Sequence, residues 1–120
     1  MTATEKAKVY GIKSCDTMKK AFTWLTGHGI EYDFHDFKKQ DLDDATIHHW
    51  IANLPLDLLI NKRGTTWRKL DDDTKQALSP ETAVSLIKAN PSLVKRPLLA
   101  VNNQLHLGFK PEQYDTIFNP

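Results

Sequence analysis

The single cysteine is the residue of this chain with the most distinctive chemistry. Among 120 residues there is one Cys, at position 15. A lone thiol excludes an intrachain disulfide and a cysteine-based zinc site, and it suits a reducing compartment. A thiol reacts as its thiolate, and an ordinary pKa of about 8.5 leaves only a few per cent ionised at neutral pH. Chemistry at Cys15 therefore requires groups that stabilise the negative charge and a second sulfur from outside the chain.

Two kinds of group can stabilise a thiolate at Cys15. The first is the N-terminus of a helix predicted from Thr17 onward, because unpaired N–H groups there, and the Thr17 hydroxyl if it turns inward, point toward the sulfur. A helix terminus contributes roughly 0.3 to 1 kcal/mol, whereas lowering a pKa by about 1.5 units requires about 2 kcal/mol. We therefore also expect cations, acting against the adjacent carboxylate of Asp16. The candidates are Lys13, Lys19, Lys20, Arg63, Arg96 and Lys110.

The elements on either side of Cys15 follow from hydrophobic patterns. Residues 8–12 (KVYGI) form a β-branched and aromatic run that predicts a strand before a tight turn. From Thr17 onward, apolar residues recur at the helical period up to Leu25, and Gly27 is a stop signal. Residues 31–37 alternate as a half-buried strand does. This β-α-β order predicts two parallel strands joined by a helix, with Cys15 at the start of that helix.

The rest of the chain predicts further helices and a hairpin. Asp41 is the expected cap of a helix that ends at Pro55, residues 55–70 are expected to form a loop with a short helical lead-in, and residues 71–78 one or two turns. Ser79 and Pro80 open a helix to about Asn90. Residues 98–101 and 104–109 flank Asn102 and Asn103, which suit a two-residue hairpin turn, and Pro111 begins a last helix.

This order predicts one α/β domain over residues 1–120, with a mixed four-stranded sheet and an inserted helical region between the second and third strands. The layout resembles the thioredoxin-like (glutaredoxin-like) folds, in which a reactive Cys lies between the first strand and first helix and a cis proline precedes the third strand. Cys15 and Pro97 occupy these two places. Only about 5 to 6% of X-Pro bonds are cis, so the isomer of the Arg96–Pro97 bond stays open here.

Four stretches carry a resemblance to a known family, and together they span residues 7–119. They are VYGIKSCDTMKKA (9–21), NKRGTTWRKL (61–70), KRPLLAV (95–101) and GFKPEQY (108–114). The chain resembles the ArsC (arsenate reductase) family, within it the YffB-like proteins, and it is similar to the Spx regulators. In the arsenate reductases three arginines surround the nucleophilic cysteine and bind the oxyanion. The matching positions here are Arg63, Arg96 and Lys110.

The departures from the family pattern narrow the expected function. Lysine at position 110 lacks the bidentate fork of arginine, and Asp16, Thr17 and Met18 replace a Gly-rich anion loop, so arsenate reduction ranks third. Met18 also stands where Spx has the second cysteine of its Cys-x-x-Cys switch. YffB-like proteins resemble glutathione-dependent thiol reductases, which is the first expectation. The alternative is an Spx-like module that binds RNA polymerase or another protein.

These hypotheses assign roles to particular residues. Cys15, Arg63 and Arg96 are the expected catalytic residues, and Lys13, Thr17, Pro97 and Lys110 the expected substrate-binding residues. Glutathione is the expected co-substrate, resolving an adduct on Cys15, and no metal is expected. His48 and His49 are adjacent in sequence, so on a helix they point about 100° apart and cannot share one ion.

Composition excludes other classes of function. Sixteen basic and 15 acidic residues leave a formal net charge of +1, so the chain lacks the concentrated positive charge of a nucleic-acid binder. The first eight residues contain no apolar signal core, and no apolar run approaches the length of a membrane span. We expect a cytoplasmic protein that is a monomer, with no membrane or nucleic-acid partner.

Overall fold

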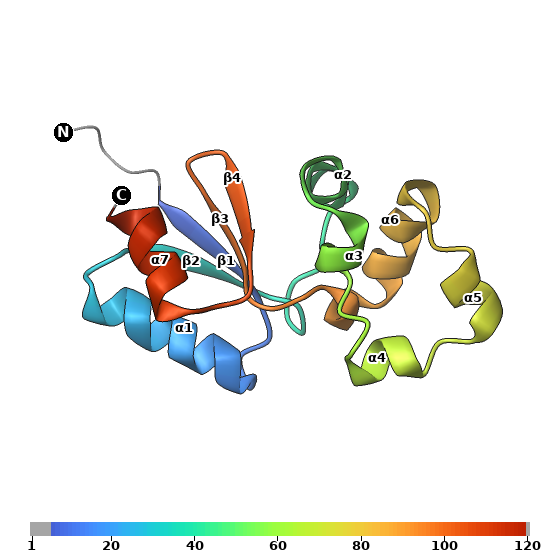
Figure 1. The fold of residues 1–120 in the computed structure, drawn as a ribbon, viewed down its shortest axis with the longest axis horizontal. Coiled ribbons are helices and arrows are strands. Elements are labelled where there is room, and N and C mark those ends of the chain that lie inside the picture. The colour runs from blue at the N-terminus through green and yellow to red at the C-terminus, as the bar shows by residue number, and fades with distance from the viewer. Residues whose placement is uncertain (1–5, 120) are drawn as a thin grey trace. The chain divides into compact units, whose positions relative to one another are not determined.

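The computed structural model describes residues 6–119, which form two compact units. The sheet unit contains residues 6–36 and 96–119, and the helical unit contains residues 37–95. Figure 1 shows the helical unit as an insertion between two parts of the sheet unit's chain. The expected inserted helical region between the second and third strands is therefore present. That the two units form a single domain stays a prediction.

The sheet unit is built on four strands, in the order β2-β1-β3-β4. They are β1 (Ala7–Gly11), β2 (Tyr32–Asp36), β3 (Leu98–Val101) and β4 (Gln104–Leu107). Strand β1 pairs parallel with β2 and antiparallel with β3, so the mixed sheet predicted from the sequence is confirmed. Helix α1 (Asp16–Gly27) connects the two parallel strands, as the β-α-β pattern predicted.

The β3–β4 hairpin has the two-residue turn that its asparagines indicated. Asn102 and Asn103 have φ values of 53° and 62°, the left-handed region that a type I′ turn requires and that asparagine tolerates. Strand β4 ends at Leu107, before the predicted end at Phe109, because Gly108 turns the chain with a φ of 77°. The N–H of Gly108 then donates to the carbonyl of Pro97 at 2.9 Å. This bond ties the end of the hairpin to the entrance of β3.

One apolar core joins the sheet to α1 and to α7 (Pro111–Phe118), which lie on the same face in Figure 1. The three residues Met18, Ala21 and Leu25 of α1 are fully buried, which confirms the predicted apolar stripe. Burying a side chain such as Leu25 contributes roughly 1.5 to 3 kcal/mol. A Cβ on Gly11 would lie 2.5 Å from the Met18 sulfur, so glycine there permits the close approach of β1 and α1. The buried members are Ala7, Val9, Met18, Ala21, Leu25, Leu99, Val101 and Tyr114.

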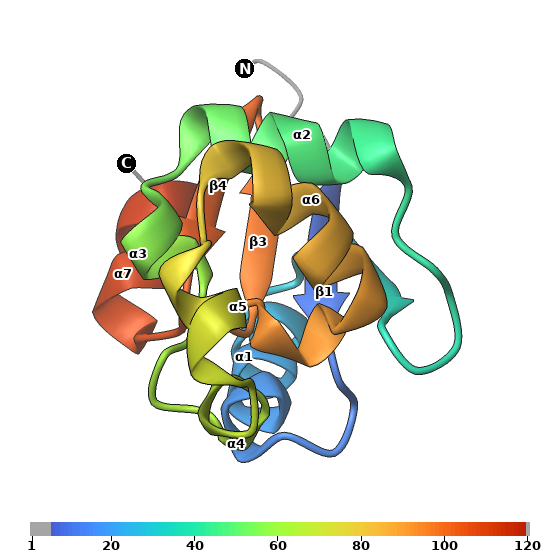
Figure 2. The ribbon, with the colours of Figure 1, turned by 90° about the vertical axis from the view of Figure 1, so that its right-hand side faces the viewer.

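The helical unit has its own core. Its helices are α2 (Asp44–Asn53), α3 (Leu56–Leu59), α4 (Thr65–Arg68), α5 (Asp72–Gln76) and α6 (Pro80–Ala89), followed by the 3₁₀ turn η1 (Pro91–Leu93). Helix α2 packs beside α6 (Figure 2), with Ile47 and Trp50 of α2 and Ile87 of α6 buried. The segment predicted as a loop with one helical lead-in contains two one-turn helices, α3 and α4.

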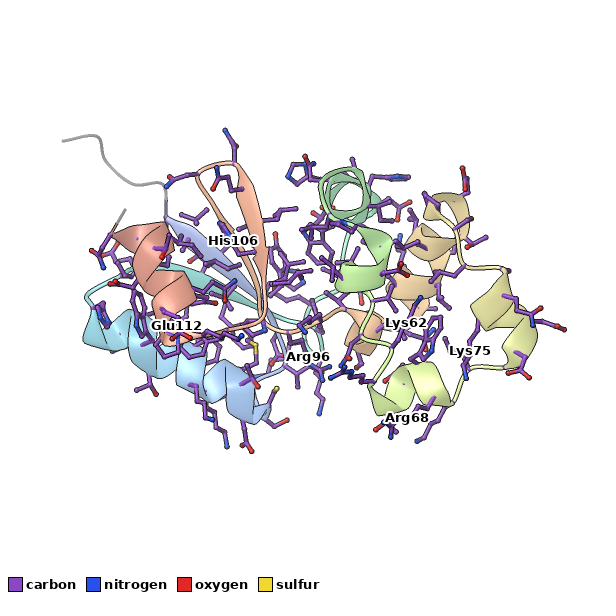
Figure 3. The ribbon with its side chains drawn as sticks, in the orientation of Figure 1. Lys62, Arg68, Lys75, Arg96, His106 and Glu112 are labelled. Carbon is purple, nitrogen blue, oxygen red and sulfur yellow. The ribbon has the colours of Figure 1, made fainter. Side chains whose placement is uncertain are left out.

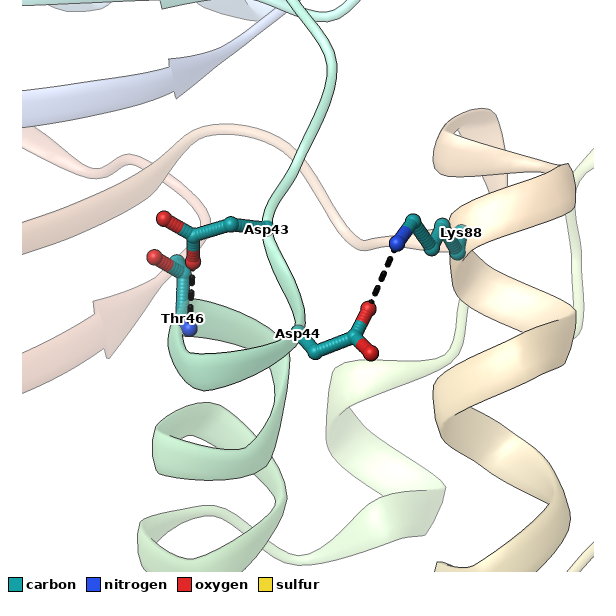
Figure 4. A network of polar contacts seen from close by, with 4 residues as sticks. All are labelled: Asp43, Asp44, Thr46 and Lys88. Carbon is teal, nitrogen blue, oxygen red and sulfur yellow. Dashed lines mark hydrogen bonds and ion pairs between the residues drawn. The ribbon is translucent and has the colours of Figure 1, made fainter.

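Side-chain caps begin several helices of this unit. The cap of α2 is Asp43, which accepts a hydrogen bond from the N–H of Thr46 at 2.8 Å, so the prediction of Asp41 was wrong by two residues. The neighbouring Asp44 pairs with Lys88 of α6 at 2.7 Å (Figure 4). Asp71 caps α5, and Ser79 forms a reciprocal capping box at the start of α6. The start of α6 is therefore where the sequence placed it.

Candidate thiolate site

Cys15 is the N-cap residue of α1 and is half-buried. Its backbone is extended, with φ −77° and ψ 131°, as is usual at an N-cap. The N–H of Cys15 donates to the carbonyl of Ile12 at 3.2 Å, and the Cys15 carbonyl accepts the N–H of Lys19 at 3.1 Å. The turn after β1 therefore holds the thiol at the open end of α1, where the sequence predicted it.

The pKa of the Cys15 thiol is lower than its ordinary value. Partial burial is the largest single effect and raises this pKa. The backbone N–H groups of Met18 and Thr17 lower it, followed by the charge and a side-chain hydrogen bond of Arg96, and together these outweigh burial. The Cys15 side chain does not close a full capping hydrogen bond, so the two amides act as partial donors. They are the N2 and N3 amides that a capping side chain normally accepts from.

Arg96 approaches the thiol because of strand pairing. It directly precedes Pro97 and strand β3, and Leu98 of β3 pairs with Tyr10 near the end of β1. The chain leaves β1 toward Cys15 at the same end of the sheet, which brings the half-buried Arg96 beside the start of α1 (Figure 3). The Arg96–Pro97 bond is cis, which answers the question the sequence left open. Pro97 is buried at the entrance of β3.

The other predicted site residues of the sheet unit do not contact the thiol through their side chains in the way that Arg96 does. Thr17 is half-buried and acts on the sulfur through its backbone N–H, whereas the sequence suggested its hydroxyl. Lys13 lies exposed in the turn before Cys15, and Lys110 is the exposed N-cap of α7. Within residues 6–119, neither lysine ammonium makes an ion pair or hydrogen bond. Asp16 is exposed to solvent.

Arg63 belongs to the helical unit. It lies exposed between α3 and α4, and its backbone N–H donates to the Asn61 side-chain oxygen at 3.2 Å. Its role toward Cys15 stays a prediction. Arg96 is thus the predicted cation that the structure brings to the thiol.

The sequence reasoning missed the specific contribution of Met18, which it assigned to packing alone. The Met18 side chain is indeed fully buried, but its N–H also acts on the sulfur. The signal was available, because once Cys15 is the N-cap, Met18 occupies the N3 position.

Within residues 6–119 no cluster of three or more His, Cys, Asp or Glu side chains is arranged to hold a metal ion. None of the helices described there has the length and apolar character of a membrane span.

Comparison with known proteins places this site in a family. The model of the ArsC family matches residues 10–117. The chain belongs to the ArsC family. The solved structure of a YFFB protein superimposes with a TM-score of 0.87 at 44% identity, covering 92% of this chain and 96% of that one. The predicted thioredoxin-like fold of this ArsC-family protein is therefore confirmed.

Within the ArsC family, this chain is similar to two curated relatives. An uncharacterized protein of Haemophilus influenzae is 42% identical over 110 residues, which are 92% of this chain and 96% of the relative. The global transcriptional regulator Spx of Streptococcus mutans is 30% identical over 103 residues, 83% of this chain and 74% of the regulator. The chain is thus similar both to YFFB and to a transcriptional regulator.

Proposed function

We propose that this ArsC-family protein is a thiol reductase whose nucleophile is the Cys15 thiolate. The observation that carries the proposal is the position of Cys15 at the N-terminus of α1, where two backbone amides and Arg96 lower its pKa. A lower pKa increases the thiolate fraction at neutral pH, and partial exposure leaves the sulfur open to attack a substrate.

The proposed substrate is a mixed disulfide between a protein or small thiol and glutathione. The Cys15 thiolate attacks the glutathione sulfur, the S–S bond breaks, and the substrate leaves as a thiolate that takes up a proton. A second glutathione thiolate then attacks the sulfur of that glutathione on Cys15, which releases glutathione disulfide and restores the Cys15 thiolate. The net reaction consumes one free glutathione thiol: the disulfide between substrate and glutathione is exchanged for glutathione disulfide, and the substrate leaves as its reduced thiol. A chain with one cysteine needs this external resolving thiol.

The residues around the sulfur have separate roles in this scheme. Arg96 stabilises the thiolate and attracts a carboxylate of glutathione. Pro97 lies next to Arg96 at the entrance of β3, and the Thr17 N–H stabilises the negative charge of the Cys15 thiolate. Lys13, Lys110 and Arg63 are proposed to contribute further positive charge to substrate binding. The reaction is proposed to take place in the cytoplasm, where glutathione is abundant and reduced.

Alkylation and mass analysis test this proposal. The rate of iodoacetamide alkylation of Cys15, measured against pH, should rise with a midpoint below that of a free cysteine peptide, because the thiolate forms at lower pH. Treatment with glutathione disulfide should add one glutathione to the protein, and reduced glutathione should remove it. An alkylation midpoint equal to that of the peptide would sink the proposal.

A second candidate function is an Spx-like module that binds RNA polymerase or another protein. The 30% identity to the Streptococcus mutans regulator favours it. The single cysteine argues against a disulfide switch within the chain, although not against partner binding. Association with purified RNA polymerase, combined with an ordinary Cys15 alkylation midpoint, would favour this candidate over the reductase.

Arsenate reduction is the third candidate. Arg96 supplies one guanidinium at the thiol, but Lys110 is an exposed N-cap residue without the bidentate geometry of arginine. We therefore expect arsenate to be a poor substrate compared with a glutathione mixed disulfide, in an assay coupled to the formation of glutathione disulfide.

A further inference from the structure

A groove of about 570 Å³ lies on the sheet unit between α1 and the segment that leads from β4 into α7. Helix α1 contributes Lys19, Lys20, Thr23 and Trp24, and the other wall is Phe109, Lys110 and Pro111. A volume of this size is within the range that accommodates a peptide segment or a small molecule. We call it the α1–α7 groove, and of its lining residues the thiolate scheme above uses Lys110 alone.

The floor of the groove is apolar and held in place. The Trp24 ring packs edge to face on the buried ring of Tyr114 with centroids 5.6 Å apart, and the Phe109 ring does the same at 4.7 Å. The Trp24 ring also stacks on the His28 ring, with centroids 3.8 Å apart. A rigid aromatic floor binds an apolar side chain without losing much conformational freedom of its own.

The rim of the groove is positively charged. Lys19, Lys20 and Lys110 are all exposed, and among residues 6–119 none of their ammonium groups pairs with a carboxylate. This differs from Lys62 and Lys88 of the helical unit, which are bound by Asp57 and Asp44 at 2.7 Å. Three unpaired cations around an apolar floor are complementary to a partner that is acidic and carries an apolar side chain.

The groove leads toward the thiol. Lys19 lies one helical turn after Cys15, and its N–H donates to the Cys15 carbonyl at 3.1 Å. From Cys15 to Thr23 the helix rises about 12 Å, a distance that an extended peptide covers in about four residues. A substrate cysteine at Cys15 would therefore place a residue about four positions away on the aromatic floor.

We infer that the α1–α7 groove binds an acidic segment of a polypeptide substrate, with an apolar side chain of that segment seated on Trp24 and Phe109. This inference rests on the proposed thiol reductase and specifies its substrate as a protein. Glutathione alone fits the groove less well, because it has carboxylates but no large apolar group to cover two aromatic rings. A single-stranded nucleic acid matches the charge and could stack on the rings, but it offers no disulfide to Cys15.

Synthetic peptides in a mixed disulfide with glutathione test the inference. Each peptide carries one cysteine joined to glutathione, and release of the peptide thiol when Cys15 attacks the glutathione sulfur is followed by chromatography. The first peptide has a leucine four residues from the cysteine and glutamates around it. In the second, glutamine replaces each glutamate, and in the third, serine replaces the leucine. The neutral reagent 2,2′-dithiodipyridine measures the intrinsic reactivity of Cys15, and every peptide rate is divided by this rate.

We expect the acidic peptide to react about tenfold faster than its glutamine counterpart at low ionic strength, and this preference to shrink with added salt. Lys20→Glu should reduce the preference about fivefold, because it reverses one charge of the rim. Lys69→Glu, which changes an exposed lysine of the helical unit, is the matched control and should retain it. The serine peptide should lose about threefold, since it has no side chain for the floor.

Equal rates for the acidic and glutamine peptides would overturn the inference, as would an unchanged preference in Lys20→Glu. It would also fail if a single-stranded oligonucleotide or free glutathione displaced the acidic peptide as effectively as a disulfide-free copy of that peptide. Failure of the proposed function looks different. In that case Cys15 reacts with 2,2′-dithiodipyridine no faster than a free cysteine peptide does at the same pH.

Discussion

The helices of five or more residues begin in different ways in the two units. In the helical unit, α2, α5 and α6 start with a side chain that accepts a backbone N–H, from Asp43, Asp71 and Ser79. In the sheet unit, α1 and α7 start at Cys15 and Lys110, and neither side chain caps its helix. A side-chain cap stabilises a helix by about 1 kcal/mol. The sheet unit forgoes that stabilisation at the position where its thiol is located.

Capped helix starts contribute to stability, whereas the uncapped start of α1 is available for chemistry. Where a side chain caps the helix, it accepts one of the first amides, which is then not free to serve a ligand. At Cys15 the amides of Thr17 and Met18 act on a sulfur instead, and Arg96 adds a positive charge. Open amides and a cation together favour an anion at this helix start, and the Cys15 thiolate is the group that they stabilise.

Cys15→Ser should have the largest effect on the reactivity of the protein, which it should abolish. It should also increase the stability of the fold slightly. All adduct formation with glutathione disulfide should disappear, because the nucleophile is gone. Serine is a better N-cap than a neutral thiol, so at a pH below the folded pKa of Cys15, where the thiol is protonated, the variant should be about 0.5 kcal/mol more stable. Mass spectrometry and urea unfolding measure the two effects.

The pH dependence of that stability difference sharpens the comparison. Because the folded pKa of Cys15 is lower than its ordinary value, thiolate formation contributes stability that is present above the ordinary pKa and lost as pH falls through the folded pKa. The advantage of Cys15→Ser should therefore shrink or reverse as pH is raised. A constant difference between the two proteins at all pH values would contradict a lowered pKa.

Arg96→Ala should have the next largest effect. It removes the charge and the hydrogen bond that lower the Cys15 pKa, so the alkylation midpoint should move to higher pH. The alkylation rate at neutral pH should fall about threefold to tenfold. Arg96→Lys keeps the charge and should recover part of the loss.

Arg68→Ala is the control for Arg96→Ala, since Arg68 is an exposed arginine at the end of α4. Its alkylation profile should match that of the parent. Arg63→Ala tests the remaining catalytic prediction, which expects a shift in the same direction as Arg96→Ala. A profile unchanged by Arg96→Ala would show that the amides alone set the pKa.

Ser79→Ala tests the capped helix starts of the helical unit. It removes the capping box that Ser79 forms with Thr82 at the start of α6, so the free energy of unfolding should fall by about 1 kcal/mol. Cys15 alkylation should not change. Chemical denaturation and the alkylation assay on the same sample measure both quantities, and an altered thiol pKa would break the proposed separation of roles.

Lys88→Met should have the smallest effect. The Lys88–Asp44 ion pair raises the Lys88 pKa, but both side chains are more than half exposed, and solvent screens such a pair. Because the folded pKa of Lys88 is raised, any contribution is present below the ordinary pKa and lost as pH rises through the folded value. Melting curves at neutral pH should be nearly the same as those of the parent, and a clear loss of stability there would be evidence against effective screening.

Local patterns predicted most of the fold because they depend on neighbours in sequence. The stripe of Met18, Ala21 and Leu25 identified α1, and the asparagines at 102 and 103 identified the hairpin. The cap of α2 was placed at Asp41 and lies at Asp43, because several aspartates precede this helix and each satisfies the local rule. The structure shows that Asp43 is the residue whose side chain accepts the N–H of Thr46.

Local sequence patterns were enough to place the thiol at a helix N-terminus between two strands. The periodicity of residues 8–37 and the rules for helix ends require only local interactions. The tertiary structure alone decided that Arg96 reaches this thiol, that the bond before Pro97 is cis, and that Trp24 and Phe109 share a groove. These features join residues far apart in the chain, and they exist only after β3 pairs with β1 and α7 packs beside α1.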